Sequence, residues 1–292
     1  ASLDSCAKAR YICLMTVLSP AEMPFMKMHG LGNDFVVLDA RERKMSLSAD
    51  LIRQIADRHR GVGFDQLAVI AKRGIDLHLT FFNSDGSFSA TCGNATRCVA
   101  HYLMVQAGTK KIRLITERGV LHAEDLGEGL TTVNLGAPQL KWYDIPLARE
   151  VNGLALPIDG RPTATGMGNP HCTFFVPDAE VVDVAQRGAE IEHHPLFPER
   201  TNVQFVSLIG PDHLRMRVWE RGVGVTQASG SSSCAVAVAA VRRGLTGRAV
   251  KINLDGGQMT AVWRDDGVWL TGPSVHVFNG RFTVEFLQQV GT

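Results

Sequence analysis

A short segment of this 292-residue chain places a cysteine where a helix is expected to begin. Cys92-Gly93-Asn94 precedes a run without glycine or proline, residues 95–107, whose apolar side chains recur at helical spacing until Gly108 ends it. The first turn of a helix presents free N–H groups and the positive end of the helix dipole, which lower the pKa of a cysteine from about 8.5 toward neutrality. We therefore predict that Cys92 removes a proton near pH 7. The alternative is an inert core thiol, because free cysteine is commonly buried.

A second segment has the same form with serine in place of cysteine. Ser229-Gly230-Ser231 precedes residues 233–243, which are rich in alanine and valine. Both predicted helices are apolar nearly all round, so each is expected inside a curved sheet. Two such helix starts facing each other across a cleft form a cradle for a carboxylate, and Gly93 and Gly230 allow the backbone to approach it closely. A substrate held there shows one face of its α-carbon to each segment, as a two-base racemase requires.

Both segments belong to an internal repeat. Residues 29–35 are echoed by residues 165–171, an offset of 136 (165 − 29 = 136). The same offset relates several further pairs: Asn33 with Asn169, Gln66 with Asn202, Gly86 with Gly222 and Cys98 with Cys234. Cys92 and Ser229 correspond at an offset that is one residue longer (229 − 92 = 137). A repeat of this length indicates two copies of a half-domain about a pseudo-twofold axis, with a cleft at the seam.

The repeat also divides the chain. It predicts an N-terminal extension, two half-domains and a C-terminal segment: residues 1–25, 26–137, 138–274 and 275–292. Lys8 and Arg10 precede a short apolar run, but no small-x-small cleavage site follows, so an extension is favoured over a signal peptide. Alternating and amphipathic patterns predict three strands and one helix in the first half: residues 75–82, 111–116 and 130–135, and residues 49–59.

Composition excludes several classes of function. The net charge is +1 without a basic stripe, so no nucleic-acid partner is expected, and no apolar run reaches the roughly 18 residues of a membrane span. The six cysteines include no C-x-x-C pair, which indicates a reducing compartment. Metal-ligand spacing, a Schiff-base lysine motif and a glycine-rich phosphate loop are all lacking in the sequence. We therefore predict no metal and no cofactor.

Six motifs follow one another along the chain: Gly32-Asn33-Asp34-Phe35, Phe64-Asp65-Gln66, Cys92-Gly93-Asn94, Gly168-Asn169-Pro170-His171-Cys172, Thr201-Asn202-Val203-Gln204-Phe205 and Trp219-Glu220-Arg221-Gly222. In this order they resemble the diaminopimelate epimerases, cofactor-independent enzymes of bacterial lysine and peptidoglycan-precursor synthesis. The resemblance runs from about Lys27 to the C-terminus. It implies an α/β (α+β) fold of two pseudo-symmetric halves, each a curved, mostly antiparallel sheet around a central helix, with the active site in the cleft between them.

The resemblance also implies a reaction and a set of residues. The reaction is epimerisation of LL-2,6-diaminopimelate to the meso isomer in the cytoplasm, by a homodimer whose C-terminal strand returns to the first half. Cys92 is implied as a catalytic acid/base, Glu220 as a partner of the reacting ammonium, and His171 as a neighbour of the base. The implied substrate contacts are the helix-end donors Gly93, Asn94, Gly230 and Ser231, and the pocket residues Asn33, Gln66, Asn83, Asn169, Asn202 and Arg221. Asparagine and arginine also suit recognition of a zwitterion on chemical grounds.

Ser229 departs from the family pattern, which has its second catalytic cysteine there and usually glutamate where Val225 stands. A serine hydroxyl is a far weaker acid than a thiol, and no activating partner is visible in the sequence. We therefore expect impaired epimerisation. Three interpretations are open: a deliberate Cys→Ser replacement, a natural enzyme in which Ser229 is a poor acid/base, or a one-base relative such as another amino-acid isomerase or a hydroxyproline-type dehydratase. A non-catalytic amino-acid binder is the fourth alternative.

Overall fold

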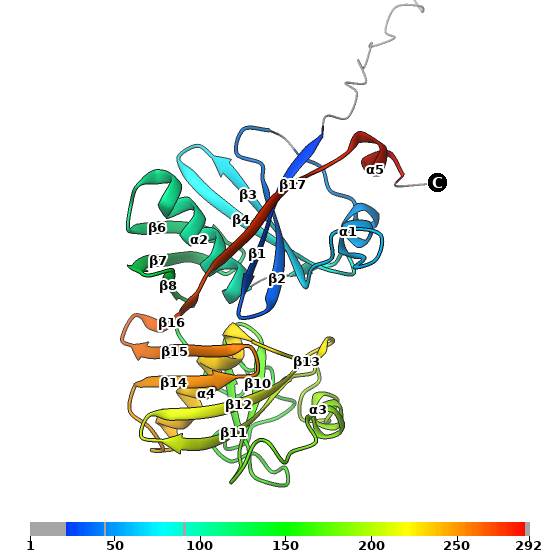
Figure 1. Cartoon of the computed structure of the whole chain (residues 1–292). Helices are drawn as coiled ribbons and strands as arrows, with labels where there is room; N and C mark the ends of the chain where they lie inside the picture. Colours follow the sequence, from blue (N-terminus) through cyan, green and yellow to red (C-terminus); the bar gives the residue numbers. More distant parts are fainter. Residues whose placement is uncertain (1–21, 44, 90–91, 290–292) are drawn as a thin grey trace, which may run out of the picture.

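The chain forms two halves of matching architecture (Figure 1). The computed structural model describes residues 22–43, 45–89 and 92–289, so residues 1–21 of the expected extension lie outside the described residues. The first half contains β1 (Met23–Gly30), β2 (Asn33–Asp39), α1 (Ala49–Ala56), β3 (Gln66–Arg73), β4 (Asp76–Asn83), β5 (Phe88–Ser89), α2 (Gly93–Ala107), β6 (Lys111–Thr116), β7 (Gly119–Gly127) and β8 (Leu130–Asn134). The strands and the helix predicted in this half correspond to β4, β6, β8 and α1.

The second half repeats the same order of strands and helices. It contains β9 (Thr163–Gly166), β10 (Pro170–Phe175), α3 (Val184–Glu192), β11 (Asn202–Gly210), β12 (His213–Glu220), β13 (Gly224–Thr226), α4 (Gly230–Arg242), β14 (Ala249–Leu254), β15 (Gly257–Arg264) and β16 (Gly267–Pro273). Two further elements follow it, β17 (Val275–Phe282) and α5 (Val284–Gln288). The second half therefore corresponds to the first element by element, from β1/β9 to β8/β16.

Strand register confirms the repeat. In the first half β2 pairs parallel with β3, placing Phe35 opposite Gln66, and in the second half β10 pairs parallel with β11, placing His171 opposite Asn202. Both partners differ by the sequence offset (171 − 35 = 136 and 202 − 66 = 136). One other parallel pair occurs in each half, β4 with β6 and β12 with β14, and the remaining named pairs are antiparallel. The predicted fold class, two pseudo-symmetric and mostly antiparallel halves, is confirmed.

Two strand pairings join the halves. The equivalent strands β8 and β16 pair antiparallel, with Thr132 opposite Thr271, so one sheet continues from the first half into the second. The chain then enters β17, which runs back to the first half and pairs antiparallel with β1 (red strand in Figure 1). Gln54 of α1 donates a hydrogen bond to the backbone carbonyl of Phe286, which fixes α5 beside the first half.

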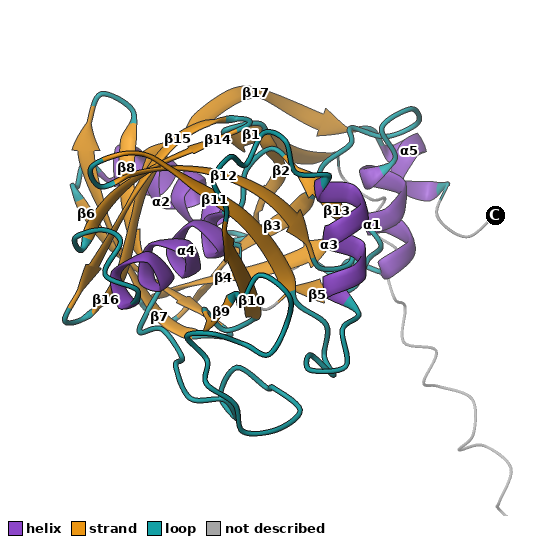
Figure 2. Cartoon of the chain, turned by 90° about the horizontal axis from the view of Figure 1, so that it is seen from below, coloured by secondary structure: helices purple, strands orange, loops and turns teal. Residues whose placement is uncertain are grey.

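The helices α2 and α4 lie inside the curved strands, whereas α1 and α3 lie on the same side of the molecule, one in each half (Figure 1 and Figure 2). On α4 every residue from Cys234 to Ala240 is buried, which confirms the prediction of an enclosed apolar helix. On α2 the prediction holds for the first turns, which bury Ala95, Cys98 and Val99, but the last turn is exposed. Glycine starts both helices. A Cβ atom on Gly230 would lie only 3.4 Å from the Cα of Gly93. The two helix starts therefore meet at the seam between the halves.

The return of β17 depends on Gly280. A Cβ atom there would lie 2.3 Å from the ring of Phe25, which is buried and stacks on Phe282 at 4.4 Å between ring centroids. Gly280→Ala should therefore lower the free energy of unfolding by about 1–3 kcal/mol through overpacking, measured by urea denaturation. Gly153→Ala is the matched control, because its Cβ would meet only atoms 3.9 Å or more away. Equal stability of the two variants would contradict this account of the β1–β17 contact.

Candidate active site

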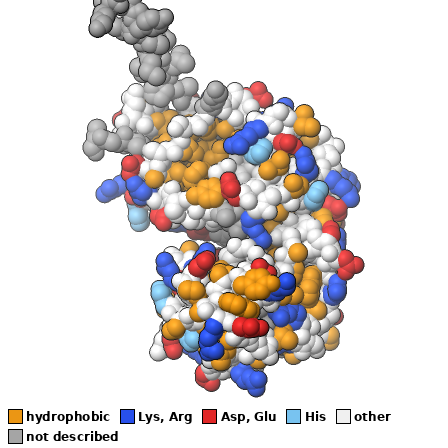
Figure 3. Space-filling view, turned by 180° about the vertical axis from the view of Figure 1, so that it is seen from behind, with side chains coloured by type: hydrophobic (Ala, Val, Ile, Leu, Met, Phe, Trp, Pro, Cys, Tyr) orange, Lys and Arg blue, Asp and Glu red, His pale blue; other side chains and the backbone are white. Residues whose placement is uncertain are grey.

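A cavity of about 600 Å³ lies between the two halves, where α2 and α4 begin. Seen from behind, the molecular surface is hollowed between the upper and lower halves (Figure 3). All of the predicted site residues except His171 line this cavity: Asn33, Gln66, Asn83, Cys92, Gly93, Asn94, Asn169, Asn202, Glu220, Arg221, Ser229, Gly230 and Ser231. These residues come from both copies of the repeat.

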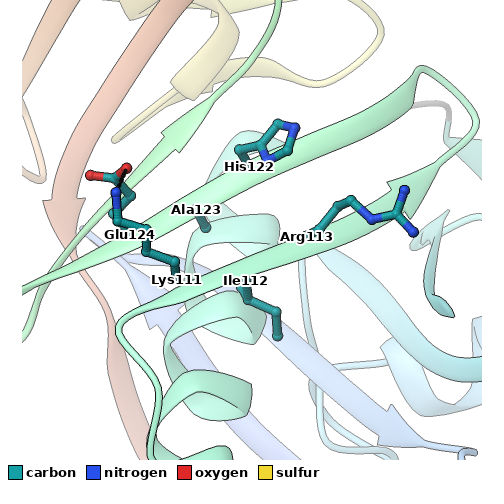
Figure 4. Close-up of a pocket in the computed structure, with 6 residues that line it drawn as sticks. All are labelled: Lys111, Ile112, Arg113, His122, Ala123 and Glu124. Atoms are coloured by element: carbon teal, nitrogen blue, oxygen red, sulfur yellow. Dashed lines mark hydrogen bonds and ion pairs between the residues drawn. The ribbon is translucent and has the colours of Figure 1, made fainter. Parts of the chain in front are cut away.

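A second hollow, of about 230 Å³, lies on the outer face of β6 and β7 (Figure 4). Lys111 and Glu124 form an ion pair of 2.8 Å at one end of it, and Arg113 points toward the other end, where it pairs with Asp76. Lys111 and Arg113 of this hollow are thus both paired with carboxylates of the protein. The hollow shares no lining residue with the cavity between the halves. The cavity is therefore the candidate active site.

Cys92 caps the N-terminus of α2. Its Sγ accepts a hydrogen bond of 3.4 Å from the backbone N–H of Ala95, and only 8% of the residue is exposed. The sequence predicts a lowered pKa at this position, and that prediction is wrong. Burial raises the pKa of Cys92 to about 12, the bond from Ala95 opposes the rise, and the nearby carboxylate of Glu220 adds to it. The positive charge of Arg97 also opposes the rise, but burial has the larger effect.

Ser229 occupies the N-cap of α4 but does not cap the helix through its side chain. Its Oγ lies 2.8 Å from Glu220 Oε2, to which it donates a hydrogen bond, and 2.9 Å from the Oγ of Ser232. The sequence reveals no activating partner for this hydroxyl, and the structure corrects that view. The β12–β13 hairpin folds Glu220 back over the start of α4, and residues nine positions apart thereby become hydrogen-bonded.

Glu220 is the carboxylate at the second helix start. It accepts hydrogen bonds from the hydroxyls of Ser229 and Thr226, the latter at 2.6 Å. Burial raises the pKa of Glu220, the two hydroxyl donors oppose the rise, and the negative charge of Asp65 adds to it. Among the described residues no cation pairs with this carboxylate, which is held by neutral hydroxyls and is well suited to pair with the ammonium group of a ligand.

His171 does not line the cavity. It is fully buried behind the cavity wall, where its Nε2 lies 2.9 Å from Asn169 Oδ1 and its Nδ1 lies 3.0 Å from Gln204 Nε2. Burial lowers the pKa of His171 to about 3, and the guanidinium groups of Arg221 and Arg118 contribute to the decrease. The imidazole is thus neutral and positions Asn169.

The asparagines of the site are connected by hydrogen bonds. Asn94 donates to Asn33 at 3.1 Å, and Asn33 donates to Asp65 at 2.8 Å. The two hydrogen-bonding groups of Asn202 serve the backbone: its amide donates to the carbonyl of Pro170, and its Oδ1 accepts from the N–H of Arg221. Asn202 therefore holds the Arg221 segment, while Asn33 belongs to a polar chain that begins inside α2.

Sequence reasoning missed six polar side chains that line the cavity: Asp65, Ser84, Asp85, Ser89, Arg118 and Thr226. Asp65 lies inside a quoted motif, next to Gln66, and could have been found. Arg118 carried no signal, because the sequence does not reveal that the turn between β6 and β7 reaches the other half. Within the described ranges, no three His, Cys, Asp or Glu side chains converge as a metal site requires. No helix in the described part of the chain is long and apolar enough to cross a membrane.

The fold is shared with a class of two-half proteins of known structure. A hydroxyproline epimerase from Agrobacterium vitis superposes with a TM-score of 0.65 at 15% identity, covering 89% of this chain and 92% of that chain. A PhzF-family phenazine biosynthesis protein from Bacillus anthracis also gives a TM-score of 0.65 at 15% identity, covering 90% and 100%. At these identities the likeness concerns the fold alone.

Sequence comparison defines the family. The profile of the diaminopimelate epimerases matches residues 25–141 and 163–277. The diaminopimelate epimerase of Rhodospirillum centenum is 48% identical over 271 residues, covering 90% of this chain and 93% of the relative. That of Acidiphilium cryptum is 47% identical over 274 residues, covering 91% and 99%. The chain belongs to the diaminopimelate epimerase family.

The raised pKa of Glu220 predicts a pH dependence of stability. Between the ordinary value of 4.5 and the raised value, the folded protein binds more protons than the unfolded chain, so the free energy of unfolding falls as pH rises through this window. Glu220→Gln should remove this component, at about 1.4 kcal/mol per unit of pKa difference. Urea denaturation between pH 4 and pH 8 measures it. Glu124→Gln on β7 is the control, and an unaltered slope in Glu220→Gln would refute the assignment.

Proposed function

We propose that the chain epimerises LL-2,6-diaminopimelate to meso-diaminopimelate by removing and returning the proton on one α-carbon, without a cofactor. The observation that carries the proposal is the placement of Cys92 and Ser229 at the starts of two facing helices in one cavity. Identity of 39–48% to eight diaminopimelate epimerases supports the choice of substrate.

The reacting carboxylate binds at the two helix starts. The N–H groups of Gly93, Asn94, Gly230 and Ser231 lie in the first turns, where no helical carbonyl is available to them. Together with the two positive dipole ends they stabilise the carboxylate and the negative charge that develops on it when the α-proton leaves. The α-carbon then lies between Cys92 and Ser229, and the substrate ammonium pairs with Glu220.

Cys92 acts as the acid/base on one face of the α-carbon. The bound ammonium group offsets the burial that raises the thiol pKa, because a nearby positive charge favours the thiolate. His171 holds Asn169, and Asn33, Gln66, Asn83, Asn202 and Arg221 complete the pocket around the rest of the substrate. These residue roles are part of the proposal.

Ser229 slows proton transfer on the opposite face of the α-carbon. The Ser229 hydroxyl has two hydrogen-bond neighbours among the described residues, Glu220 and Ser232. Of these, only the carboxylate of Glu220 is a base, and the hydroxyl donates its hydrogen-bonding proton to it. A hydroxyl remains a much weaker acid than a thiol even beside a carboxylate, so the proton is returned slowly. The result is proton exchange that starts at Cys92, with slow inversion.

Isotope exchange tests this function. In D₂O, the wild-type chain should exchange the α-hydrogen of one diaminopimelate isomer and invert it slowly. Ser229→Cys should raise the rate of epimerisation by about 10²–10⁴-fold, the contribution of a positioned acid/base. Proton NMR follows exchange, and chiral chromatography follows inversion.

The control variants separate the alternatives. Ser233→Cys places a thiol on the same helix, but Ser233 does not line the cavity, so the epimerisation rate should stay unchanged. Cys92→Ser should abolish exchange with both isomers. Rapid epimerisation by the wild type that Ser229→Cys leaves unaltered would overturn the two-thiol account. Release of water and a keto acid would indicate a dehydratase, and binding without exchange would indicate a binding protein.

We further propose a homodimer that works in the cytoplasm. Strand β17 exposes Val277 and Phe278 by 52% and 47%, apolar surface that a second copy would cover. Cys92, Cys98, Cys172 and Cys234 are free thiols, as suits a reducing compartment. Light scattering should give about twice the chain mass of 31.7 kDa, and a monomer at micromolar concentration would contradict the proposal.

A further inference from the structure

Arg118 carries a positive charge across the seam between the halves. It stands in the turn between β6 and β7 of the first half, yet its guanidinium donates a hydrogen bond to the backbone carbonyl of Met167 in the second half. The group lies directly against Gly168, where a Cβ atom would be only 2.3 Å from its Cζ. Arg118 and Gly168 both line the cavity, and Asn169 follows Gly168 in its wall.

The charge of Arg118 has no counter-ion within the described residues. Its recorded side-chain hydrogen bond goes to a carbonyl, and burial lowers its pKa without a carboxylate to offset the effect. Arg113 on β6, five residues before Arg118, pairs instead with Asp76. Because desolvating an unpaired charge is costly, a partly buried guanidinium at a cavity wall favours binding of an anion.

A second unpaired guanidinium lines the same cavity. Arg221 of the second half donates to the backbone carbonyl of Glu199 at 3.0 Å and likewise has no carboxylate partner in the described part of the chain. The two arginines line the cavity from opposite halves, Arg118 from the first and Arg221 from the second. The acidic side chains of the cavity have other partners: Asp65 is bound by Arg58 and Asn33, Asp85 accepts from the N–H of Ser87, and Glu220 accepts from hydroxyls.

We propose that Arg118 binds the second carboxylate of the substrate, the one remote from the reacting carbon, and that with Arg221 it selects a dicarboxylic amino acid. This inference rests on the proposed function. The helix starts hold the reacting carboxylate, so the two guanidiniums are left for the other one. Since they come from different halves, a carboxylate bound by both also links the halves across the seam. Fork-like guanidinium contacts are well matched to a carboxylate.

Calorimetric binding to the full chain tests the proposal with two ligands. Diaminopimelate and L-lysine share one skeleton, but lysine lacks the second carboxylate. Arg118→Met should weaken binding of diaminopimelate by about 10- to 100-fold and change the Kd of lysine by less than about threefold. Arg118→Lys, which keeps the positive charge, should recover part of the loss. Arg113→Met is the matched control and should leave both Kd values unchanged.

Each other outcome overturns the assignment. Equal weakening of both ligands would mean that Arg118 holds the reacting end or only joins the halves, and the melting temperature of the ligand-free variant would report the latter. Unchanged binding of both ligands would exclude any contact with substrate. A wild-type chain that binds lysine but not diaminopimelate would refute the proposed function, and this inference with it. If the wild type binds diaminopimelate and Arg118→Met binds it with the same affinity, the inference about Arg118 is refuted but the proposed function is not.

Discussion

Two helix N-termini meet at the centre of this molecule because glycine is the first residue of each helix. Gly93 and Gly230 allow the backbones of α2 and α4 to approach closely, with 3.4 Å between a Cβ atom on Gly230 and the Cα of Gly93. Two positive dipole ends that face each other are unfavourable without an anion between them. The same contact that organises the core therefore creates a site for a carboxylate, and the repeat supplies one helix from each half.

The enclosing sheet follows from the helices. An apolar helix surface must be buried on every side, and a sheet curved around α4 buries all residues from Cys234 to Ala240. The pairing of β8 with β16 continues the sheet between the halves, so that one hydrophobic core contains residues of both helices. The continuous sheet and the shared core therefore hold the two halves together, and the cavity lies between the halves where the two helices begin.

Features that occur in both copies of the repeat could be predicted from the sequence. The shared offset of 136 and the glycine-flanked helix starts were sufficient to predict the two halves, the buried helices and a common cavity. The features that the sequence did not predict depend on how separate segments pack against one another in three dimensions. The pKa of Cys92 depends on how completely its surroundings exclude water, the Ser229–Glu220 bond depends on a hairpin, and Arg118 reaches the cavity only because a turn crosses the seam. Periodicity and motif spacing contain none of this information.

The difference between Cys92 and Ser229 separates binding from proton transfer. Cys92 caps its own helix, so its Sγ already satisfies one N–H of α2. Ser229 gives its hydrogen bond to Glu220 and leaves the first turn of α4 uncapped by its side chain. The N–H groups of Gly230 and Ser231 consequently do not depend on the identity of residue 229. In the proposed function, a hydroxyl in place of a thiol there removes a competent acid/base from one face of the substrate, while the helix starts proposed to hold the carboxylate stay intact.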